Sequence, residues 1–449
     1  MSLRLKTIGV LCALLSLSAA ALAGPPSASA ATPKPEAHDI DMHRGGPSWD
    51  VRAPGASART HGHSVVRGAG ATFEFTYVEP VRPELKRVVE EAGRRWGAVL
   101  RSARPIVVLV RDVPDLSFTD AYAVNVIRNS SSLPEHPSLI PGVMYPMALL
   151  NAITGQDISP AGTPITNIRP ECVAIGCDLV ASFGGPDWYF GLDGKPGAGQ
   201  YDAVSVAEHE IGHGLGFDTD ALVTGALGSF SPAPTVYDRF LVAGDGVRLT
   251  SIAPDSTELA ARIQSNDLFF DGPSAQLAFG SPVPLFAPDP YVDGTSLSHV
   301  SAASLPGSMM VSAAQSPLVG KTRTLDTVTL GILADLGWPM RNRLSVEGAK
   351  APERDGAQLR FTLRLAQPAV VGVKVRYASE DASATAGRDY TAVTGVAEIP
   401  AGRSSTVVSV PVLPDRIKEP RETMVLRLTL SAGATLGTTQ ARGTIVDER

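Results

Sequence analysis

Residues 202–216 read DAVSVAEHEIGHGLG, and this stretch predicts a helix that presents two histidines on one face. Asp202 stands where a helix N-cap is expected, because its carboxylate can accept hydrogen bonds from the first backbone N–H groups. Apolar residues at helical spacing form one stripe, made of Val204, Ala207, Ile211 and Leu215. His209 and His213 lie one turn apart, so both imidazoles share the other face.

The pattern H-E-x-x-H in this helix predicts a metal site. Histidines at i and i+4 can both reach one zinc ion at about 2.0–2.1 Å, and Glu210 then lies where it can take a proton from a bound water. The alternative is a helix surface with two solvated histidines. It leaves unexplained why Gly212, Gly214 and Gly216 accompany them, since glycines weaken a helix unless close packing or a turn requires them.

The run from His209 to Gly216 resembles the H-E-x-x-H-x-x-G motif of the metzincin metallopeptidases. The third histidine of that motif would fall at Thr219, a poor zinc ligand, so the third ligand is expected elsewhere. His299 is the one histidine that follows His213 in the chain. A third histidine displaced by a long insertion resembles the leishmanolysin-type metzincins, in which the methionine of the Met-turn follows about eleven residues later.

The resemblance implies a full set of site residues. The zinc ligands would be His209, His213 and His299, and the general base would be Glu210. Met310, eleven residues after His299, would be the Met-turn methionine, with Met309 as the alternative by one position. Asp218 is the alternative third ligand, because a carboxylate also binds zinc.

Residues 69–340 around this motif are expected to form one α+β, metzincin-like catalytic domain. A strand is expected at 72–78, a helix at 84–100 and a strand at 106–110. A helix at 325–336 is expected to close the domain before Gly337 and Pro339. The 85 residues between His213 and His299 are expected to form a subdomain that shapes the lower side of the cleft.

Residues 341–449 are expected to form a separate all-β sandwich. Alternating strands are expected at 359–365, 370–377 and 405–412, separated by Gly, Asp and Pro turns. The runs 353–356 (ERDG) and 381–390 (DASATAGRDY) resemble the Calx-beta domain, which is also found in sodium/calcium exchangers.

The Calx-beta resemblance implies candidate calcium ligands. Those that match the acidic ligands of exchanger domains are Glu353, Asp381, Asp415, Glu419, Glu422 and Asp447. Ca²⁺ takes six to eight oxygens of this kind. Pro414 and Arg416 stand where the calcium-binding members carry more acid, so solvated loop acids are the alternative to a calcium site.

The N-terminal 23 residues predict a secretory signal. Arg4 and Lys6 precede a short apolar run at 8–17, and an A-x-A cleavage pattern ends the segment at 21–23. Residues 24–68 lack hydrophobic periodicity and are expected to be a disordered linker or a pro-segment. The sequence therefore predicts a secreted protein, extracellular or associated with the cell surface.

The cysteines support the same compartment. Cys12 falls in the expected signal, which leaves Cys172 and Cys177 as an even pair five positions apart. In an exported chain this spacing favours a local disulfide, and two free thiols are the alternative.

Charge and hydropathy exclude other function classes. The chain carries 39 Lys and Arg against 45 Asp and Glu, a net charge of −6, so no basic footprint for nucleic acid is expected. No stretch after the signal is long and apolar enough for a transmembrane segment. We therefore expect a secreted zinc endopeptidase that acts on proteins or peptides. The alternative is a non-catalytic binding or adhesion protein, with surface or matrix contacts through the Calx-beta domain.

Overall fold

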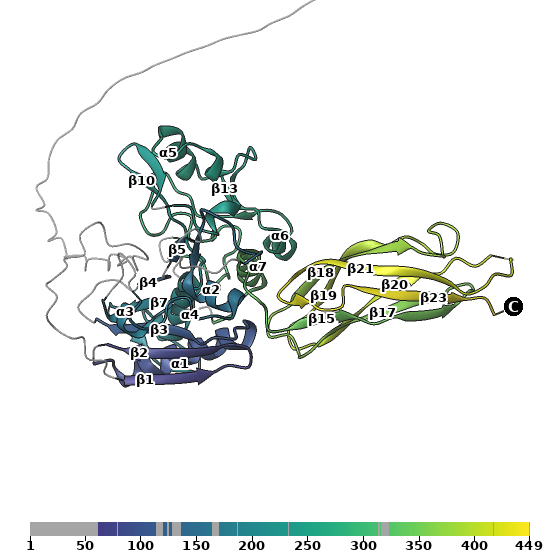
Figure 1. Ribbon diagram of the computed structural model, residues 1–449, viewed down its shortest axis with the longest axis horizontal. Coiled ribbons are helices and arrows are strands. Elements are labelled where there is room, and N and C mark those ends of the chain that lie inside the picture. Colours follow the sequence, from purple (N-terminus) through teal and green to yellow (C-terminus); the bar gives the residue numbers. More distant parts are fainter. Residues whose placement is uncertain are drawn as a thin grey trace, which may run out of the picture. The chain divides into compact units, whose positions relative to one another are not determined.

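The computed structural model describes residues 62–78, 80–113, 120–123, 125–127, 136–163, 170–185, 187–231, 233–312, 315, 323–415 and 417–448 (Figure 1). The expected signal, 1–23, and the expected linker up to residue 61 lie outside these residues. The described residues form two main apolar cores, a larger one drawn chiefly from residues 66–340 and a smaller one from residues 344–445. None of the described helices combines the length and apolar character needed to cross a membrane.

The N-terminal domain is mixed α/β and is built on a five-stranded sheet of order β1-β2-β3-β7-β4. Its strands are β1 (Gly62–Arg67), β2 (Thr72–Tyr77), β3 (Ile106–Asp112), β7 (Leu179–Phe183) and β4 (Asp120–Ala123). The three central strands are parallel, and the two edge strands, β1 and β4, run antiparallel to their neighbours.

Strand β1 corrects the sequence analysis, which assigned residues 62–67 to the linker. Val66 is buried and pairs in register with Phe73 of β2. It is the one buried residue of the strand, so the local pattern lacks the alternation that marks a strand. Antiparallel pairing with β2, which joins residues distant from the local pattern, makes this segment a strand.

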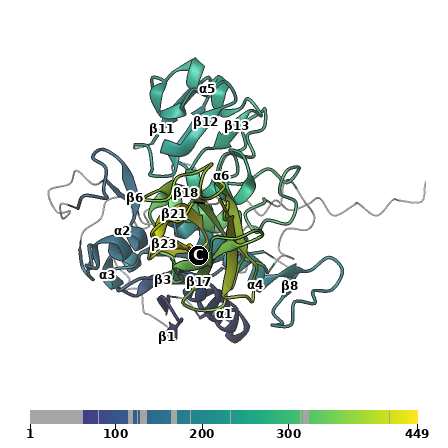
Figure 2. The ribbon, with the colours of Figure 1, turned by 90° about the vertical axis from the view of Figure 1, so that its right-hand side faces the viewer.

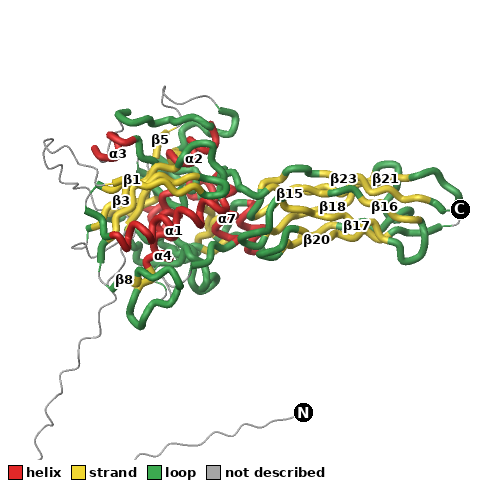
Figure 3. Tube along the Cα trace, turned by 90° about the horizontal axis from the view of Figure 1, so that it is seen from below, coloured by secondary structure: helices red, strands yellow, loops and turns green. Residues whose placement is uncertain are grey.

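Helices cover both faces of this sheet (Figures 2 and 3). Helices α1 (Pro83–Val99) and α4 (Ala203–Gly214) lie on one side, and α2 (Met147–Thr154) and α3 (Pro170–Ile175) lie on the other. Successive strand residues point to opposite faces. In β3, Val108 and Val110 accordingly join the large core, whereas Leu109 packs in a smaller cluster with Met147 and Cys172.

The long segment after α4 forms small sheets and short helices. Its elements are β10 (Ala221–Thr224), β11 (Leu227–Phe230), η1 (Asp238–Phe240), β12 (Leu241–Ala243), η2 (Leu249–Ser251), α5 (Thr257–Ile263), β13 (Leu268–Phe270), α6 (Pro273–Phe279) and β14 (Val283–Pro284). The short pairs β5 (Asn125–Ile127) with β6 (Met144–Pro146) and β8 (Trp188–Tyr189) with β9 (Tyr201–Asp202) precede α4. The domain closes with α7 (Thr327–Leu336), where Asp326 caps the start and Gly337, at φ 111°, ends the helix.

The C-terminal domain is the all-β sandwich that the sequence predicted. One sheet has the order β20-β17-β15-β22 and the other β16-β23-β21-β18-β19. The strands are β15 (Arg343–Val346), β16 (Ala349–Pro352), β17 (Gln358–Leu365), β18 (Val373–Asp381), β19 (Thr394–Ile399), β20 (Ser405–Pro411), β21 (Glu422–Ala432), β22 (Thr435–Leu436) and β23 (Gln440–Val446). Alternate residues of β17, among them Leu359, Phe361 and Leu363, are fully buried, as sandwich strands require.

Candidate metal centre

Helix α4 begins at the predicted cap. The Asp202 carboxylate accepts hydrogen bonds from the backbone N–H groups of Val204 at 3.0 Å and Ser205 at 3.4 Å. Every residue of the helix is buried. This corrects the expected single apolar stripe, because α1, β4 and β7 all pack against α4 and leave it no solvent face.

The structure brings His209, His213 and His299 together. The Nε2 atoms of His209 and His213 lie 2.9 Å apart, and those of His209 and His299 lie 3.3 Å apart. All three side chains are buried, and their ligand atoms lie within 4.8 Å of one another. The group does not include Asp218, the alternative third ligand.

A backbone carbonyl fixes the orientation of each imidazole. The Nδ1 of His209 lies 2.5 Å from the carbonyl oxygen of Met309. The Nδ1 of His213 lies 2.8 Å from the carbonyl oxygen of Phe217. The Nδ1 of His299 lies 2.8 Å from the carbonyl oxygen of Thr295. A carbonyl oxygen can only accept, so each Nδ1 carries a proton, and in the neutral ring the Nε2 then carries the lone pair.

These three Nε2 atoms fit a transition-metal ion. Two nitrogens at about 2.05 Å from a tetrahedral zinc lie about 3.3 Å apart, close to the distances found here. Neutral imidazoles that donate through Nδ1 are also the usual form of metal-bound histidine.

Main-chain pairing holds His299 in place. The His299 carbonyl accepts a hydrogen bond from Phe286 N, and the next residue, Val300, donates to the Met310 carbonyl, both at 2.9 Å. The Tyr237 hydroxyl donates to the carbonyl of Leu297 at 2.8 Å, and Leu297 has a φ of 72°, a strained value for this residue type. Tyr237 is fully buried and serves to anchor this segment.

Met309 and Met310 have distinct positions. Met309 supplies the carbonyl that bonds His209, whereas the Met310 side chain packs against α4. A Cβ added at Gly212 would lie 3.0 Å from the Met310 Sδ and 3.4 Å from the Trp96 ring. Close packing therefore requires a glycine at 212.

The other two glycines also have structural reasons. A Cβ added at Gly214 would lie 3.0 Å from the Leu179 side chain, and Gly216, at φ 107°, turns the chain out of the helix.

Two carboxyl groups lie on α4 next to the histidines. Glu210 and Glu208 are both 0% exposed. The Arg95 Nε lies 3.1 Å from the Glu208 carboxylate, yet burial raises the pKa of Glu208 to about 8. The sequence analysis did not single out this Glu208–Arg95 pair, whose members are 113 positions apart.

Arg323 forms a second ion pair with a buried carboxylate, at the start of α4. Its guanidinium donates to both carboxylate oxygens of Asp202, at 2.6 and 2.9 Å. It also donates to the carbonyls of Gly191 and Leu192 at 2.6 Å each. Arg323 thus connects the loop before α4 to the helix cap. No local pattern in the sequence predicts this role.

Asp238 organises the segment of chain just after α4. It accepts from the Thr219 hydroxyl at 2.5 Å and from the backbone N–H of Thr235 at 2.8 Å and of Asp220 at 3.1 Å. Burial raises the pKa of Asp238 to about 7, against the lowering effect of these hydrogen bonds. Thr219, which stands where the motif would carry a third histidine, therefore serves this network.

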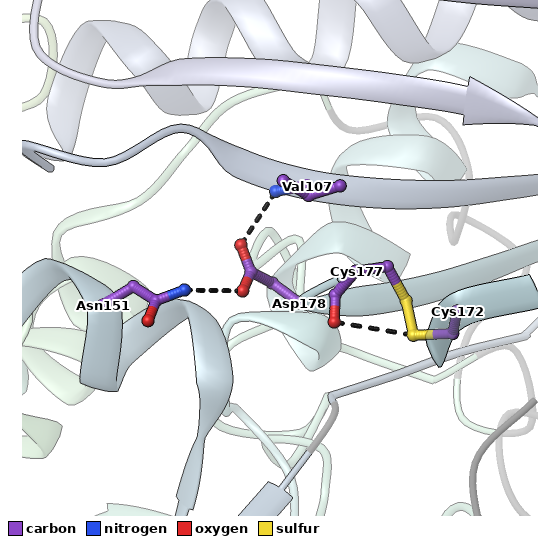
Figure 4. Close-up of a disulfide and its surroundings, with 5 residues drawn as sticks. All are labelled: Val107, Asn151, Cys172, Cys177 and Asp178. Atoms are coloured by element: carbon purple, nitrogen blue, oxygen red, sulfur yellow. Dashed lines mark hydrogen bonds between the residues drawn. A yellow bond between two sulfur atoms is a disulfide. The ribbon is translucent and has the colours of Figure 1, made fainter. Parts of the chain in front are cut away.

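The structure joins Cys172 and Cys177 in a buried disulfide with Cα atoms 4.9 Å apart (Figure 4). The neighbouring Asp178 accepts from Val107 N and from the Asn151 amide, both at 2.8 Å. Asp178 is 1% exposed, and this burial raises its pKa to about 8. The disulfide and the buried carboxyl together link α2, α3 and β3.

A second group that could hold a cation lies in the C-terminal domain and comprises Asp389, Glu419 and Glu422. Two of these were predicted as calcium ligands, and Asp389 was not, although it lies in the quoted run 381–390. Desolvation and then the charge of Asp389 raise the pKa of Glu422, and Glu419 and Glu353 add to this effect.

The other predicted calcium ligands lie as follows. Glu353 accepts from Asp415 N at 2.9 Å, and Asp447 accepts from Glu419 N at 3.3 Å, so these residues border the group. Asp381 differs, because its carboxylate accepts from the Tyr390 hydroxyl at 2.6 Å and from Ala386 N at 2.9 Å, which lowers its pKa.

The comparisons with known proteins concern the C-terminal domain. Residues 342–449 match the family model of the Calx-beta domain, which confirms the resemblance stated for this region. The apo form of the Calx CBD1 domain is similar at 21% identity, covering 24% of this chain and 98% of that one, with a TM-score of 0.23. The calcium-binding domain CBD12 of CALX1.1 is similar at 23% identity, covering 24% and 46%, with a TM-score of 0.23. A search of curated proteins found no match.

Proposed function

We propose that residues 69–340 form a zinc-dependent endopeptidase of the metzincin type. The observation that carries the proposal is the convergence of three buried Nε2 atoms, each oriented by a carbonyl at Nδ1. A scaffold for binding alone has no need of three inward-facing lone pairs with a carboxylate one residue from the first of them.

His209, His213 and His299 would hold the zinc ion. When bound, zinc polarises a carbonyl and lowers the pKa of a bound water to about 7. Glu210 takes the proton from the attacking water and returns it to the nitrogen of the leaving amine.

Strand β4 supports a peptide as the substrate. It ends the order of the five-stranded sheet, and α4 packs against it. An extended peptide can add to such an edge through main-chain hydrogen bonds. A strand edge of this kind suits an endopeptidase, because main-chain hydrogen bonds recognise the backbone of a substrate whatever its side chains.

The test compares the full chain with Glu210→Gln and with Glu258→Gln, a matched change at an exposed residue of α5. We expect one zinc per chain in all three by mass spectrometry. Cleavage of an unfolded protein substrate should fall at least about a hundredfold only in Glu210→Gln, and a chelator should abolish it in the others. Absence of zinc, or equal cleavage by Glu210→Gln, would refute the proposal.

We also propose that the protein is exported. The signal-like segment at 1–23 and the pair Cys172–Cys177 support this, because such disulfides persist in oxidising compartments. Detection of the chain outside the producing cell, without residues 1–23, tests it.

A second function is favoured by the acidic group Asp389, Glu419 and Glu422, namely calcium binding by the Calx-beta domain. A similar solved protein is described as a calcium-binding domain. Calcium binding by this domain would also be compatible with the alternative function, a non-catalytic adhesion protein.

Calorimetry on the zinc-loaded full chain tests calcium binding. Heat on titration with calcium should vanish in Asp389→Asn and persist in Asp355→Asn, a control at an exposed turn. No heat at millimolar calcium in the wild type would refute it.

A further inference from the structure

One peptide group lies between His209 and the hydroxyl of a buried serine. The carbonyl of Met309 faces the Nδ1 of His209 at 2.5 Å, and the N–H of that same peptide belongs to Met310. In a trans peptide the C=O and the N–H point in opposite directions. The Met310 N–H accordingly points away from the histidine and donates to the Ser308 hydroxyl oxygen at 3.2 Å. The Met309–Met310 peptide is therefore held on both sides.

Behind Ser308 lies the carboxylate of Asp326, the residue that caps α7. Its Oδ2 accepts from the Ser308 hydroxyl at 2.8 Å and from Met309 N at 3.4 Å. Because a carboxylate can only accept, the hydroxyl proton of Ser308 points to Asp326, and the lone pairs of that hydroxyl are left for the Met310 N–H. A continuous hydrogen-bond relay therefore runs from Asp326 through Ser308 and one peptide group to His209.

Each hydrogen bond in this relay reinforces the next. A hydroxyl that donates to a carboxylate becomes a better acceptor, and a peptide whose N–H donates becomes a better acceptor at its C=O, because hydrogen bonds in series polarise one another. The Met309 carbonyl thus accepts more strongly from the Nδ1–H of His209. Outer partners of this kind orient metal-bound histidines and raise their basicity.

The hydrogen bonds behind His299 end differently. Its Nδ1 faces the Thr295 carbonyl, and the N–H of that peptide, on Ser296, donates to the carbonyl of Val292 at 2.9 Å. This acceptor is a neutral peptide group, whereas the relay behind His209 ends in a carboxylate. Hydrogen bonds to charged groups are roughly twice as strong as those between neutral groups, so we expect stronger polarisation at His209.

We propose that Asp326 is a positioning residue of the metal centre and acts on His209 through Ser308 and the Met309 carbonyl. It fixes the plane of the imidazole and strengthens the Nε2 as a ligand. The inference rests on the proposed zinc peptidase function. It adds a residue for which the H-E-x-x-H pattern gives no signal.

Three variants of the full chain separate this role from a structural one. Asp326→Asn keeps the shape and a residue that caps helices equally well, but an amide cannot accept on both sides as a carboxylate does. Ser308→Ala removes the hydroxyl that links Asp326 to Met310. Thr329→Val is the structural control, because it deletes another buried hydrogen bond to the same Asp326 oxygen, at 2.8 Å, and leaves the relay intact.

Zinc affinity is the first readout, measured by competition with a chromophoric chelator. Asp326→Asn and Ser308→Ala should each bind zinc about tenfold more weakly, which is the lower end of what the loss of a direct partner of a ligand costs. Thr329→Val should keep the wild-type affinity, and so should Ser304→Ala, at an exposed serine of the same loop. Equal affinity in the wild type and all four variants would overturn the proposal.

Proton NMR of the zinc-loaded chain, with nitrogen-15 in its histidines, is the second readout. The signal of an Nδ1–H proton moves to lower field as its hydrogen bond strengthens. In Asp326→Asn and Ser308→Ala we expect the signal of His209 to move to higher field and those of His213 and His299 to keep their positions. A purely structural role would move none of the three signals or all of them, and either result would contradict the relay.

The two readouts also separate this proposal from the proposed function. If the wild type binds zinc and cleaves its substrate, and the variants match it in affinity and in NMR, the relay is overturned and the peptidase proposal stands. If the wild type takes up no zinc, the peptidase proposal fails and the relay fails with it.

Discussion

The Nε2 atoms of His209 and His299, residues 90 positions apart in the chain, lie 3.3 Å apart in the fold. His299 reaches this point because its main chain pairs with Phe286 on one side and Val300 pairs with Met310 on the other. Backbone hydrogen bonds thus position the third histidine of the group, and α4 supplies the other two.

Replacing His299 by alanine should abolish stoichiometric zinc binding, because two imidazoles and water hold zinc far more weakly than three imidazoles. The matched control is His63→Ala, at an exposed residue of β1. Mass spectrometry of the native protein after dialysis should find about one zinc in the control and none in the variant. Full zinc content in His299→Ala would show that another residue, with Asp218 the first to test, is the third ligand.

Gly212→Ala should destabilise the domain although alanine favours helices. The added Cβ would lie 3.0 Å from the Met310 Sδ, and overpacking of a buried site costs about 1–3 kcal/mol, more than the gain in helix propensity of about 1 kcal/mol. Gly307→Ala has open space around the new Cβ and should be neutral. The thermal unfolding temperature measures both, and equal values would contradict the close packing of Met310 on α4.

Arg323→Gln should destabilise the protein by about 3 kcal/mol, because Asp202 is almost fully buried and would lose its charge partner. Arg364→Gln removes an exposed pair with Glu347 and should cost less than about 1 kcal/mol. Urea unfolding compares the two variants. Limited proteolysis should also cut the loop at 191–199 faster in Arg323→Gln, since the carbonyls of Gly191 and Leu192 lose their donor.

The buried Asp178 should make the free energy of unfolding fall as the pH rises. Its pKa is raised from 3.8 to about 8 by burial, so between these values the folded state keeps a proton that the unfolded state has released. The contribution is fully present below pH about 4 and is lost by pH about 8.

Asp178→Asn should flatten this dependence, even though it loses one of two hydrogen bonds and is less stable at pH 5. Unfolding temperatures at pH 5 and pH 8 measure the slope, with Asp255→Asn as the control. An unchanged slope in Asp178→Asn would show that Asp178 is already ionised at pH 5.

Periodicity in the sequence located several of the longer elements of the fold. The expected helices at 84–100 and 325–336 are found at Pro83–Val99 and Thr327–Leu336, and the expected strand at 359–365 is found at Gln358–Leu365. Strand β1 was missed because only Val66 of its six residues is buried. The complete burial of α4 was also missed. Hydrophobic periodicity identifies one apolar face of a helix, and it does not show whether the opposite face is also covered by other elements.

The structure brings together only some of the predicted calcium ligands of the Calx-beta domain. Glu419 and Glu422 were singled out as candidate ligands and lie together, whereas Asp389 joins them from a turn whose conformation the local residues do not fix. Asp381 was singled out and is instead held by Tyr390.

The local geometry of the candidate site could be predicted from the sequence: the cap at Asp202, two histidines one turn apart, and glycines where close packing or a turn requires them. These follow from the fixed rise and turn of a helix. Only the tertiary structure decided that His299 joins them, that Arg95 and Arg323 support the helix, and that Asp326 lies beside Ser308. Such contacts join residues many positions apart, and their formation depends on the packing of whole elements, which no local pattern encodes.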